Sequence, residues 1–152
     1  MREQVETVVG GRELLDRVAP LWEALNRFHR ECSTHFGHAL GAGGFAARRA
    51  ELLEKASAIR VEVACGPGGD VGYCIGTLDS GGRGEIDSLF VKEECRGAGL
   101  GRRLALSAMG WLEVSGASPI DLMVVAGNRA AIDFYERLGF YPRNVHLVRK
   151  QE

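Results

Sequence analysis

The chain has 152 residues, of which 45% are hydrophobic, so its length allows one domain with a buried core and leaves no room for a second. Its 19 basic and 20 acidic side chains give a formal net charge of −1, which argues against the basic surface that nucleic-acid-binding proteins need. We therefore expect a single domain over residues 1–152 that acts on small molecules or peptides.

Neither a targeting segment nor a metal site is predicted. The first six residues alternate in charge without an apolar core of signal-peptide length, and no later apolar run is long enough to span a membrane. The four cysteines (Cys32, Cys65, Cys74 and Cys95) lie far apart with no C-x-x-C pair, which disfavours a zinc cluster or a disulfide framework. We expect a cytoplasmic protein with reduced thiols, no metal and no membrane partner.

The amino-terminal part predicts two helices and a loop. Apolar residues at three- and four-residue steps predict a helix from about residue 12 to about residue 31. Residues 33–44 contain two histidines and four glycines and predict a loop, of the kind that often shapes the mouth of a substrate site. A second helix then carries Phe45, Leu52, Leu53 and Ala56.

Three strands are predicted next, because helical spacing gives way to alternation with β-branched residues. They occupy residues 59–64, 71–78 and 85–91, and the glycine-rich turns between them predict an antiparallel meander. A helix near residues 100–115 and a strand at 119–125 follow, and this strand–helix–strand unit predicts a parallel pair. A helix from Asn128 to Arg137 and a last strand from Phe140 to Lys150 complete the prediction.

The most informative segment is residues 96–103, Arg-Gly-Ala-Gly-Leu-Gly-Arg-Arg, which connects the third strand to the helix after it. Glycines allow the main chain to approach a ligand, and free N–H groups at a helix start carry partial positive charge that suits an anion. This predicts a diphosphate-binding loop, with a flexible connection as the alternative. Arg102-Arg103 stands where a Walker A loop has Lys-Ser or Lys-Thr, which disfavours a P-loop nucleotidase.

Arg96-x-x-Gly99-x-Gly101 resembles the acyl-CoA signature of the GNAT N-acetyltransferase superfamily. Upstream, Glu85-Ile86-x-x-Leu89-Phe90-Val91 looks like that family's fourth strand, and downstream, residues 128–140 are similar to its second motif. The motifs cover roughly residues 59–150, and the first 58 residues match only in being two helices. The resemblance implies an α/β (α+β) fold, with a mixed, mostly antiparallel sheet whose central parallel strands splay apart between flanking helices.

The resemblance also implies acetyl-CoA as co-substrate. Its diphosphate would lie on main-chain amides of the glycine-rich loop, and its pantetheine arm would lie in the gap between the splayed strands, near Leu89 and Val91. A bulge there would leave an N–H facing the thioester oxygen. The implied coenzyme contacts are Leu89, Phe90, Val91, Arg96, Gly97, Ala98, Gly99, Leu100, Gly101, Arg102, Asn128 and Tyr135. Asn128 is equally explained as a helix N-cap.

Direct attack of an amine on a thioester needs a neutral amine, a stabilised oxyanion and a proton for the departing thiolate. The resemblance places a tyrosine hydroxyl near the coenzyme sulfur at Tyr135, which is the candidate acid, with packing alone as the alternative. Glu85 stands where several family members have a glutamate that deprotonates the amine through water. Strict alternation puts Asp87 on the same face, so both carboxylates are candidates, and either could be a solvated charge.

These residues predict an N-acetyltransferase that acetylates a primary amine of an unidentified small molecule or peptide. We expect helix 12–31 and loop 33–44 to form the acceptor's wall. His29, His35 and His38 in this part are expected to be ordinary surface residues, with contact to the acceptor as the alternative. Cys95 has no base near it in sequence and is not expected to be a nucleophile. The alternatives are an inactive acyl-CoA-binding sensor or assembly module and a nucleotide-binding protein. Dimers are common in the family, so a homodimer is compatible with the resemblance.

Overall fold

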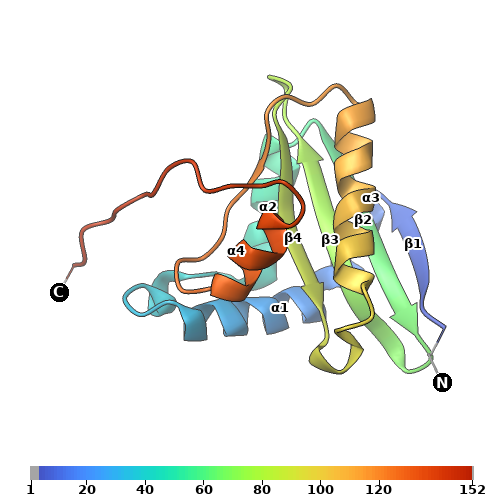
Figure 1. Ribbon diagram of the computed structural model, residues 1–152, viewed down its shortest axis with the longest axis horizontal. Helices are drawn as coiled ribbons and strands as arrows, with labels where there is room; N and C mark the ends of the chain where they lie inside the picture. Colours follow the sequence, from blue (N-terminus) through green and yellow to red (C-terminus); the bar gives the residue numbers. More distant parts are fainter. Residues whose placement is uncertain (1–3, 152) are drawn as a thin grey trace.

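The computed structural model describes residues 4–151, and within this range five strands form one sheet in the order β1-β2-β3-β4-β5 (Figure 1). The strands are β1 (Glu6–Gly10), β2 (Ala58–Gly66), β3 (Gly69–Leu78), β4 (Gly84–Val91) and β5 (Ile120–Leu122). The α-helices are α1 (Leu15–Cys32), α2 (Gly44–Lys55), α3 (Leu100–Val114) and α4 (Arg129–Glu136). Residues 1–3, part of the charged amino-terminal stretch, and residue 152 lie outside the described range.

Neighbouring strands from β1 to β4 are antiparallel, whereas β4 and β5 are parallel. The parallel pairing covers only three residue pairs and ends at Ile86 and Leu122. Beyond Ile86, β4 continues to Val91 without β5 beside it. The predicted fold class is therefore confirmed: the sheet is mixed and mostly antiparallel, and its parallel strands separate. In the described residues this pair lies at one edge of the sheet and not at its centre, because no strand pairs with the other side of β5.

Helices cover the two faces of the sheet with separate apolar clusters. On one face, α1 and α2 pack on Val61, Val63, Tyr73 and Ile75 of β2 and β3. On the other face, apolar residues of α3 pack on the opposite sides of β2, β3 and β4, and Tyr135 of α4 joins the same cluster. Burying both faces fixes the register of β4, because a slip of one residue would reverse every side chain.

Three sequence predictions are wrong in detail. Strand β1 was not predicted, because five mostly exposed residues at a sheet edge lack a clear apolar alternation. Strand β5 covers three residues instead of the seven expected over 119–125. The predicted last strand, Phe140–Lys150, is not a strand in the described structure. Residues with a high β-propensity form a strand only where the main chain of a second strand offers hydrogen bonds.

The loop between β5 and α4 packs against the end of α1 at Gly127. Its φ is +98°, and a Cβ added there would lie 2.3 Å from the main-chain oxygen of Cys32. We expect Gly127→Ala to lower the free energy of unfolding by about 2 kcal/mol or more, because strain and a backbone clash add. Chemical denaturation measures this.

Gly139→Ala is the matched control for this prediction. Gly139 has a similar φ of +93°, but an added Cβ there meets no heavy atom within 4 Å. The Gly139→Ala variant should therefore lose only the stability that the positive φ costs an alanine, without a clash. Equal losses of stability in the two variants would contradict the close packing of the 127 loop on α1.

Candidate active site

The glycine-rich loop is open on its outer side. Gly97 and Gly99 have φ values of +89° and +82°, and a Cβ added at either position meets no heavy atom within 4 Å. In the part of the chain that the structure describes, no protein acceptor takes up the main-chain N–H groups of residues 97–102. These amides lie where α3 begins at Leu100, so the loop presents free donors and a helix N-terminus at one place.

Arginines surround this loop in two different ways. Arg96 donates a hydrogen bond from Nε to the main-chain oxygen of Val91 (2.8 Å), and its guanidinium lies 5.6 Å from the centre of the Phe90 ring. It therefore fastens the loop to the end of β4. Arg102 and Arg103 are exposed in the first turn of α3. The loop thus has the free amides and the positive charge that a diphosphate requires.

A bulge in β4 decides which side chains face which side of the sheet. Ile75 pairs with Ser88 while Gly76 pairs with Ile86, so Asp87 is the extra residue. The bulge expected near Leu89 and Val91 is thus present in this strand, but at Asp87. After it, Leu89 and Val91 pack in the cluster under α3, whereas Phe90 packs in the cluster under α1 and α2.

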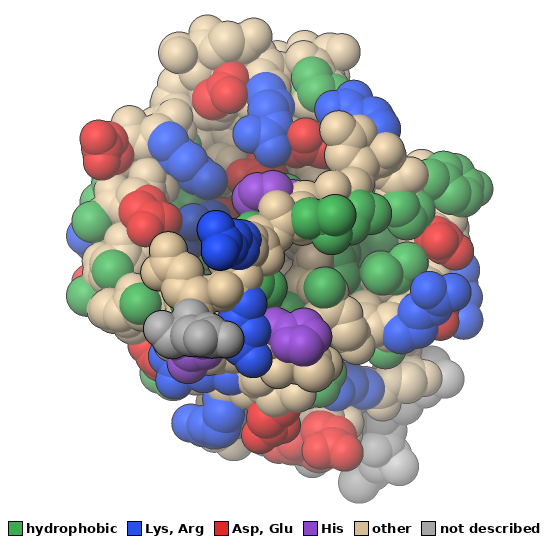
Figure 2. Space-filling view, turned by 90° about the vertical axis from the view of Figure 1, so that its left-hand side faces the viewer, with side chains coloured by type: hydrophobic (Ala, Val, Ile, Leu, Met, Phe, Trp, Pro, Cys, Tyr) green, Lys and Arg blue, Asp and Glu red, His purple; other side chains and the backbone are tan. Residues whose placement is uncertain are grey.

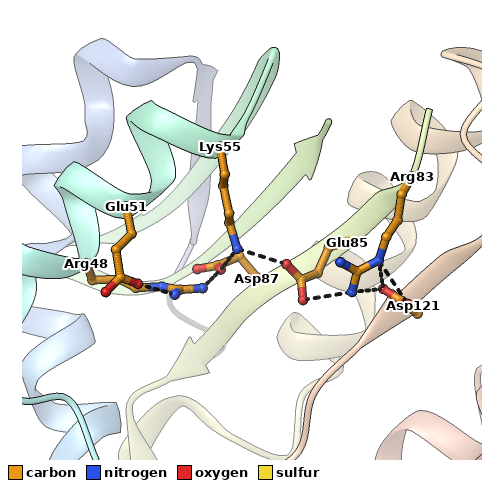
Figure 3. Close-up of polar contacts among 7 residues, drawn as sticks. All are labelled: Arg48, Glu51, Lys55, Arg83, Glu85, Asp87 and Asp121. Atoms are coloured by element: carbon orange, nitrogen blue, oxygen red, sulfur yellow. Dashed lines mark hydrogen bonds and ion pairs between the residues drawn. The ribbon is translucent and has the colours of Figure 1, made fainter. Parts of the chain in front are cut away.

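Seven charged residues of alternating sign run from α2 across β4 to β5 (Figure 3). In order they are Glu51, Arg48, Asp87, Lys55, Glu85, Arg83 and Asp121, and we call them the charge ladder. Lys55 Nζ lies 3.3 Å from Glu85 Oε1 and 3.9 Å from Asp87 Oδ1. The two carboxylates therefore share the α2 face of β4, as strict alternation predicts.

The two candidate bases differ in their surroundings. The Asp87 side chain is 1% exposed; its Oδ1 contacts Arg48, and its Oδ2 is buried without a hydrogen-bond partner among residues 4–151. The Glu85 side chain is 12% exposed, with Lys55 3.3 Å from Oε1 and Arg83 3.5 Å from Oε2. Asp87 therefore keeps a free oxygen at the point where β4 leaves β5, whereas both oxygens of Glu85 are engaged.

A hollow of about 360 Å³ opens beside Glu85. Its walls come from the end of α2, from β3 and from the turn between β3 and β4, and its polar lining includes Lys55, Thr77, Asp79 and Arg83. A second hollow, of about 570 Å³, lies between α1 and the end of β4, with Leu21, Phe90 and Lys92 among its lining residues. Both lie on the face of the sheet that carries the charge ladder.

The predicted residues of α4 lie on the other side. Asn128 is buried, and its Oδ1 accepts a hydrogen bond from the main-chain N–H of Ala131 (3.2 Å), so it is the N-cap of α4. The Tyr135 ring packs edge-on against the rings of Phe134 and Phe140, with distances between ring centres of 4.9 Å and 5.8 Å, respectively. Burial raises the pKa of the Tyr135 hydroxyl, which keeps it protonated and able to donate a proton near neutral pH.

Tyr135 and the two carboxylates therefore lie on opposite faces of β4. Tyr135 shares a cluster with Leu89 and Val91 under α3, while Asp87 faces Arg48 of α2. Beyond Ile86 and Leu122 the hydrogen-bonded pairing of β4 with β5 ends, so the sheet no longer separates the two faces there. A proton acceptor and a proton donor thus lie on the two sides of one strand.

Sequence reasoning missed the cations of the charge ladder. Arg48 and Lys55 are seven residues apart on α2, a spacing that places both on one helix face, so their shared direction could have been predicted but not their partners. In the described residues, no hydrogen bond or ion pair joins His29, His35 or His38 to a member of the ladder.

Residues 22–140 match the Acetyltransferase (GNAT) family. The chain belongs to this family. A mycothiol acetyltransferase of Streptomyces avermitilis is 38% identical over 71 residues, which are 47% of this chain and 23% of that protein. An uncharacterized N-acetyltransferase of Methanocaldococcus jannaschii is 38% identical over 76 residues, 49% of this chain and 48% of that protein. The matches thus span less than half the length of these curated relatives.

Solved GNAT structures share the fold over nearly the whole chain. The aminoglycoside N-acetyltransferase AAC(6')-Iy in complex with CoA gives a TM-score of 0.70 at 18% identity, covering 99% of this chain and 97% of that one. A ribosomal-protein-alanine N-acetyltransferase from Brucella melitensis biovar Abortus gives a TM-score of 0.64 at 17% identity, covering 96% of this chain and 99% of that one. Within residues 4–151, no helix of this GNAT protein combines the length and apolar character needed to cross a membrane.

Proposed function

We propose that this GNAT protein transfers the acetyl group of acetyl-CoA to a primary amine of a small molecule or peptide. The observation that carries the proposal is the separation of β4 from β5 beyond Ile86, with free loop amides after the end of β4, carboxylates on one face of β4 and a protonated tyrosine on the other. The presence of both a proton acceptor and a proton donor favours a catalyst over an acyl-CoA-binding sensor.

Acetyl-CoA, which supplies the thioester, fits the residues present. The free N–H groups of residues 97–102 and the exposed Arg102 suit its diphosphate. Leu89 and Val91 lie on the part of β4 that has no β5 paired with it, along which its pantetheine arm would lie, and the buried Asn128 keeps its amide N–H donors for that arm while its Oδ1 caps α4. An added Cβ has room at Gly97 and Gly99, so the space above the loop is available to a ligand.

Asp87 and Tyr135 carry the proton transfers in this proposal. Asp87 accepts a proton from the ammonium form of the acceptor through its free Oδ2, and the neutral amine then attacks the carbonyl carbon. A carbon–nitrogen bond forms as the carbon–sulfur bond breaks, and the Tyr135 hydroxyl gives its proton to the departing sulfur. The nitrogen loses its second proton to solvent as the amide forms, and the Tyr135 phenolate regains a proton from solvent, while the proton on Asp87 is released before the next turnover. Glu85 holds Lys55 and Arg83 in the charge ladder and lines the adjoining hollow.

The enzymatic proposal is tested by incubating the protein with acetyl-CoA and a panel of amines while free thiol is measured. We expect thiol release that depends on the amine. Tight coenzyme A binding without such release from any amine in a broad panel would contradict catalysis and support a binding module. Thermal stabilisation by ATP and not by coenzyme A would instead support a nucleotide-binding protein.

Replacing Tyr135 by phenylalanine tests the proposed acid. We expect turnover to fall by about 100-fold, because the departing thiolate loses its proton donor, while coenzyme affinity changes by less than about threefold. Steady-state kinetics and calorimetric titration measure the two quantities. Tyr141→Phe is the matched control, since Tyr141 is 75% exposed beyond α4. Full turnover in Tyr135→Phe would remove Tyr135 from the mechanism.

A further inference from the structure

Helix α2 carries Arg48 to a fixed place beside β4. The two buried residues of this helix, Phe45 and Leu52, lie three positions before and four positions after Arg48, so all three share one side of the helix. The Phe45 ring packs against Trp22 of α1, with 5.5 Å between the ring centres. Packing before and after Arg48 therefore fixes the direction from which its side chain approaches the strand.

The Arg48 guanidinium is held between two carboxylates (Figure 3). Its Nη1 lies 2.9 Å from Oε2 of Glu51, one turn further along α2, and its Nη2 contacts Oδ1 of Asp87. The Arg48 side chain is 29% exposed and the Asp87 side chain is 1% exposed, so the contact between them is shielded from solvent. A charge-assisted hydrogen bond in such surroundings is stronger than the same bond in water.

The side of the molecule toward which the loop between α1 and α2 projects is mixed in charge (Figure 2). Acidic and basic side chains lie next to one another across this face. The field at Asp87 therefore depends mainly on the charged groups nearest to it, which are Arg48 and Lys55 on α2 and Glu85 on β4.

A second cation is available to Asp87 if Arg48 is removed. Lys55 Nζ lies 3.9 Å from Asp87 Oδ1, which is beyond hydrogen-bond distance, and it comes from the same helix. The terminal torsion of an aspartate is broad, so a carboxylate released from Arg48 is able to turn toward Lys55. Oδ2, which has no hydrogen-bond partner among residues 4–151, would then lose its present direction.

We infer that Arg48 is a positioning residue, which holds Oδ1 of Asp87 and thereby keeps Oδ2 directed at the acceptor amine. The inference rests on the proposed function, in which Asp87 accepts the proton of the ammonium. Arg48 takes up no proton itself, because a guanidinium stays charged in proteins. It supplies the positive charge that a buried carboxylate needs and leaves one carboxylate oxygen free.

A double-mutant cycle tests this role. We expect Arg48→Ala to lower turnover by about 30-fold with the amine that the unaltered protein acetylates fastest in the panel, while affinity for coenzyme A changes by less than about threefold. In the Asp87→Asn background the same substitution should lower turnover by less than about threefold, because the group that Arg48 positions has been removed. Equal losses in both backgrounds would indicate a merely structural role and overturn the inference.

Two further variants separate the loss of position from a general disturbance of α2. Arg48→Lys keeps the positive charge, so it should recover part of the turnover lost in Arg48→Ala. Arg49→Ala is the matched control and should keep the unaltered turnover, because Arg49 is the next residue of α2 and its Nε lies 3.1 Å from Oδ1 of Asp16. Full turnover in Arg48→Ala, or an equal loss in Arg49→Ala, would contradict the positioning role.

Crystal structures of the unaltered protein and of Arg48→Ala test the geometry without an acceptor. We expect the Asp87 carboxylate of the variant to turn toward Lys55, so that the distance of 3.9 Å shortens to that of a hydrogen bond. A carboxylate that keeps its orientation would overturn the inference. Absence of thiol release with every amine contradicts the proposed function whatever the carboxylate does, so the two failures are distinguishable.

Discussion

Gly99→Glu should weaken coenzyme A binding by at least about 100-fold, or ~2.7 kcal/mol. The glycine lies in the middle of the free amides of residues 97–102, and its added side chain would meet no protein atom within 4 Å of the Cβ. The glutamate would therefore project into the space proposed for the diphosphate and would bring a negative charge to it. Isothermal titration with coenzyme A measures the effect.

Two further variants separate the causes of this loss. Gly116→Glu shares the positive φ (+77°) and the open surroundings, but it lies at the far end of α3 and should leave coenzyme affinity unchanged. Gly99→Lys adds similar bulk with the opposite charge, so it should lose less affinity than Gly99→Glu. Unchanged affinity in Gly99→Glu would show that the coenzyme lies elsewhere.

Asp87→Asn should lower turnover by about 100-fold or more, while coenzyme affinity changes little. The amide keeps the shape of the carboxylate but cannot accept the proton of an ammonium. Because Asp87 is buried and contacts Arg48, some stability is also lost, at about 1–3 kcal/mol. Kinetics are therefore compared at a temperature at which thermal denaturation shows both proteins to be folded.

Glu85→Gln is the internal comparison for this variant. Both oxygens of Glu85 lie next to cations, Lys55 and Arg83, so we expect its loss of turnover to be smaller than that of Asp87→Asn. The two side chains lie on the same face of one strand. Among the described residues, only Asp87 has a carboxylate oxygen that is buried without a hydrogen-bond partner. A larger loss in Glu85→Gln would move the role of base to Glu85.

Much of the fold could be predicted from local patterns. The turns around Gly69 and Gly82, both with positive φ, connect alternating segments and so indicate β2, β3 and β4 before any tertiary contact is known. Asn128 and Gly139 mark the two ends of α4 in the same local way. The order of the motifs then indicated the family, which the comparison confirms.

The remaining features depend on contacts between distant residues. Arg48 and Lys55 meet Asp87 and Glu85 only because α2 packs across β4, which no local pattern encodes. The bulge at Asp87 depends on how β4 pairs with β3. Residues 143–150 have a strand-like sequence, but whether such a segment forms a strand depends on a partner outside it.

The position of β4 between Tyr135 and Asp87 has a kinetic consequence. If the proton donor serves the departing sulfur on one side and the proton acceptor serves the incoming nitrogen on the other, neither reactant has to leave before the second arrives. Both must be present together for turnover. Initial-rate plots at several fixed concentrations of one reactant should then intersect, whereas parallel lines would indicate that the acyl group first passes to the protein.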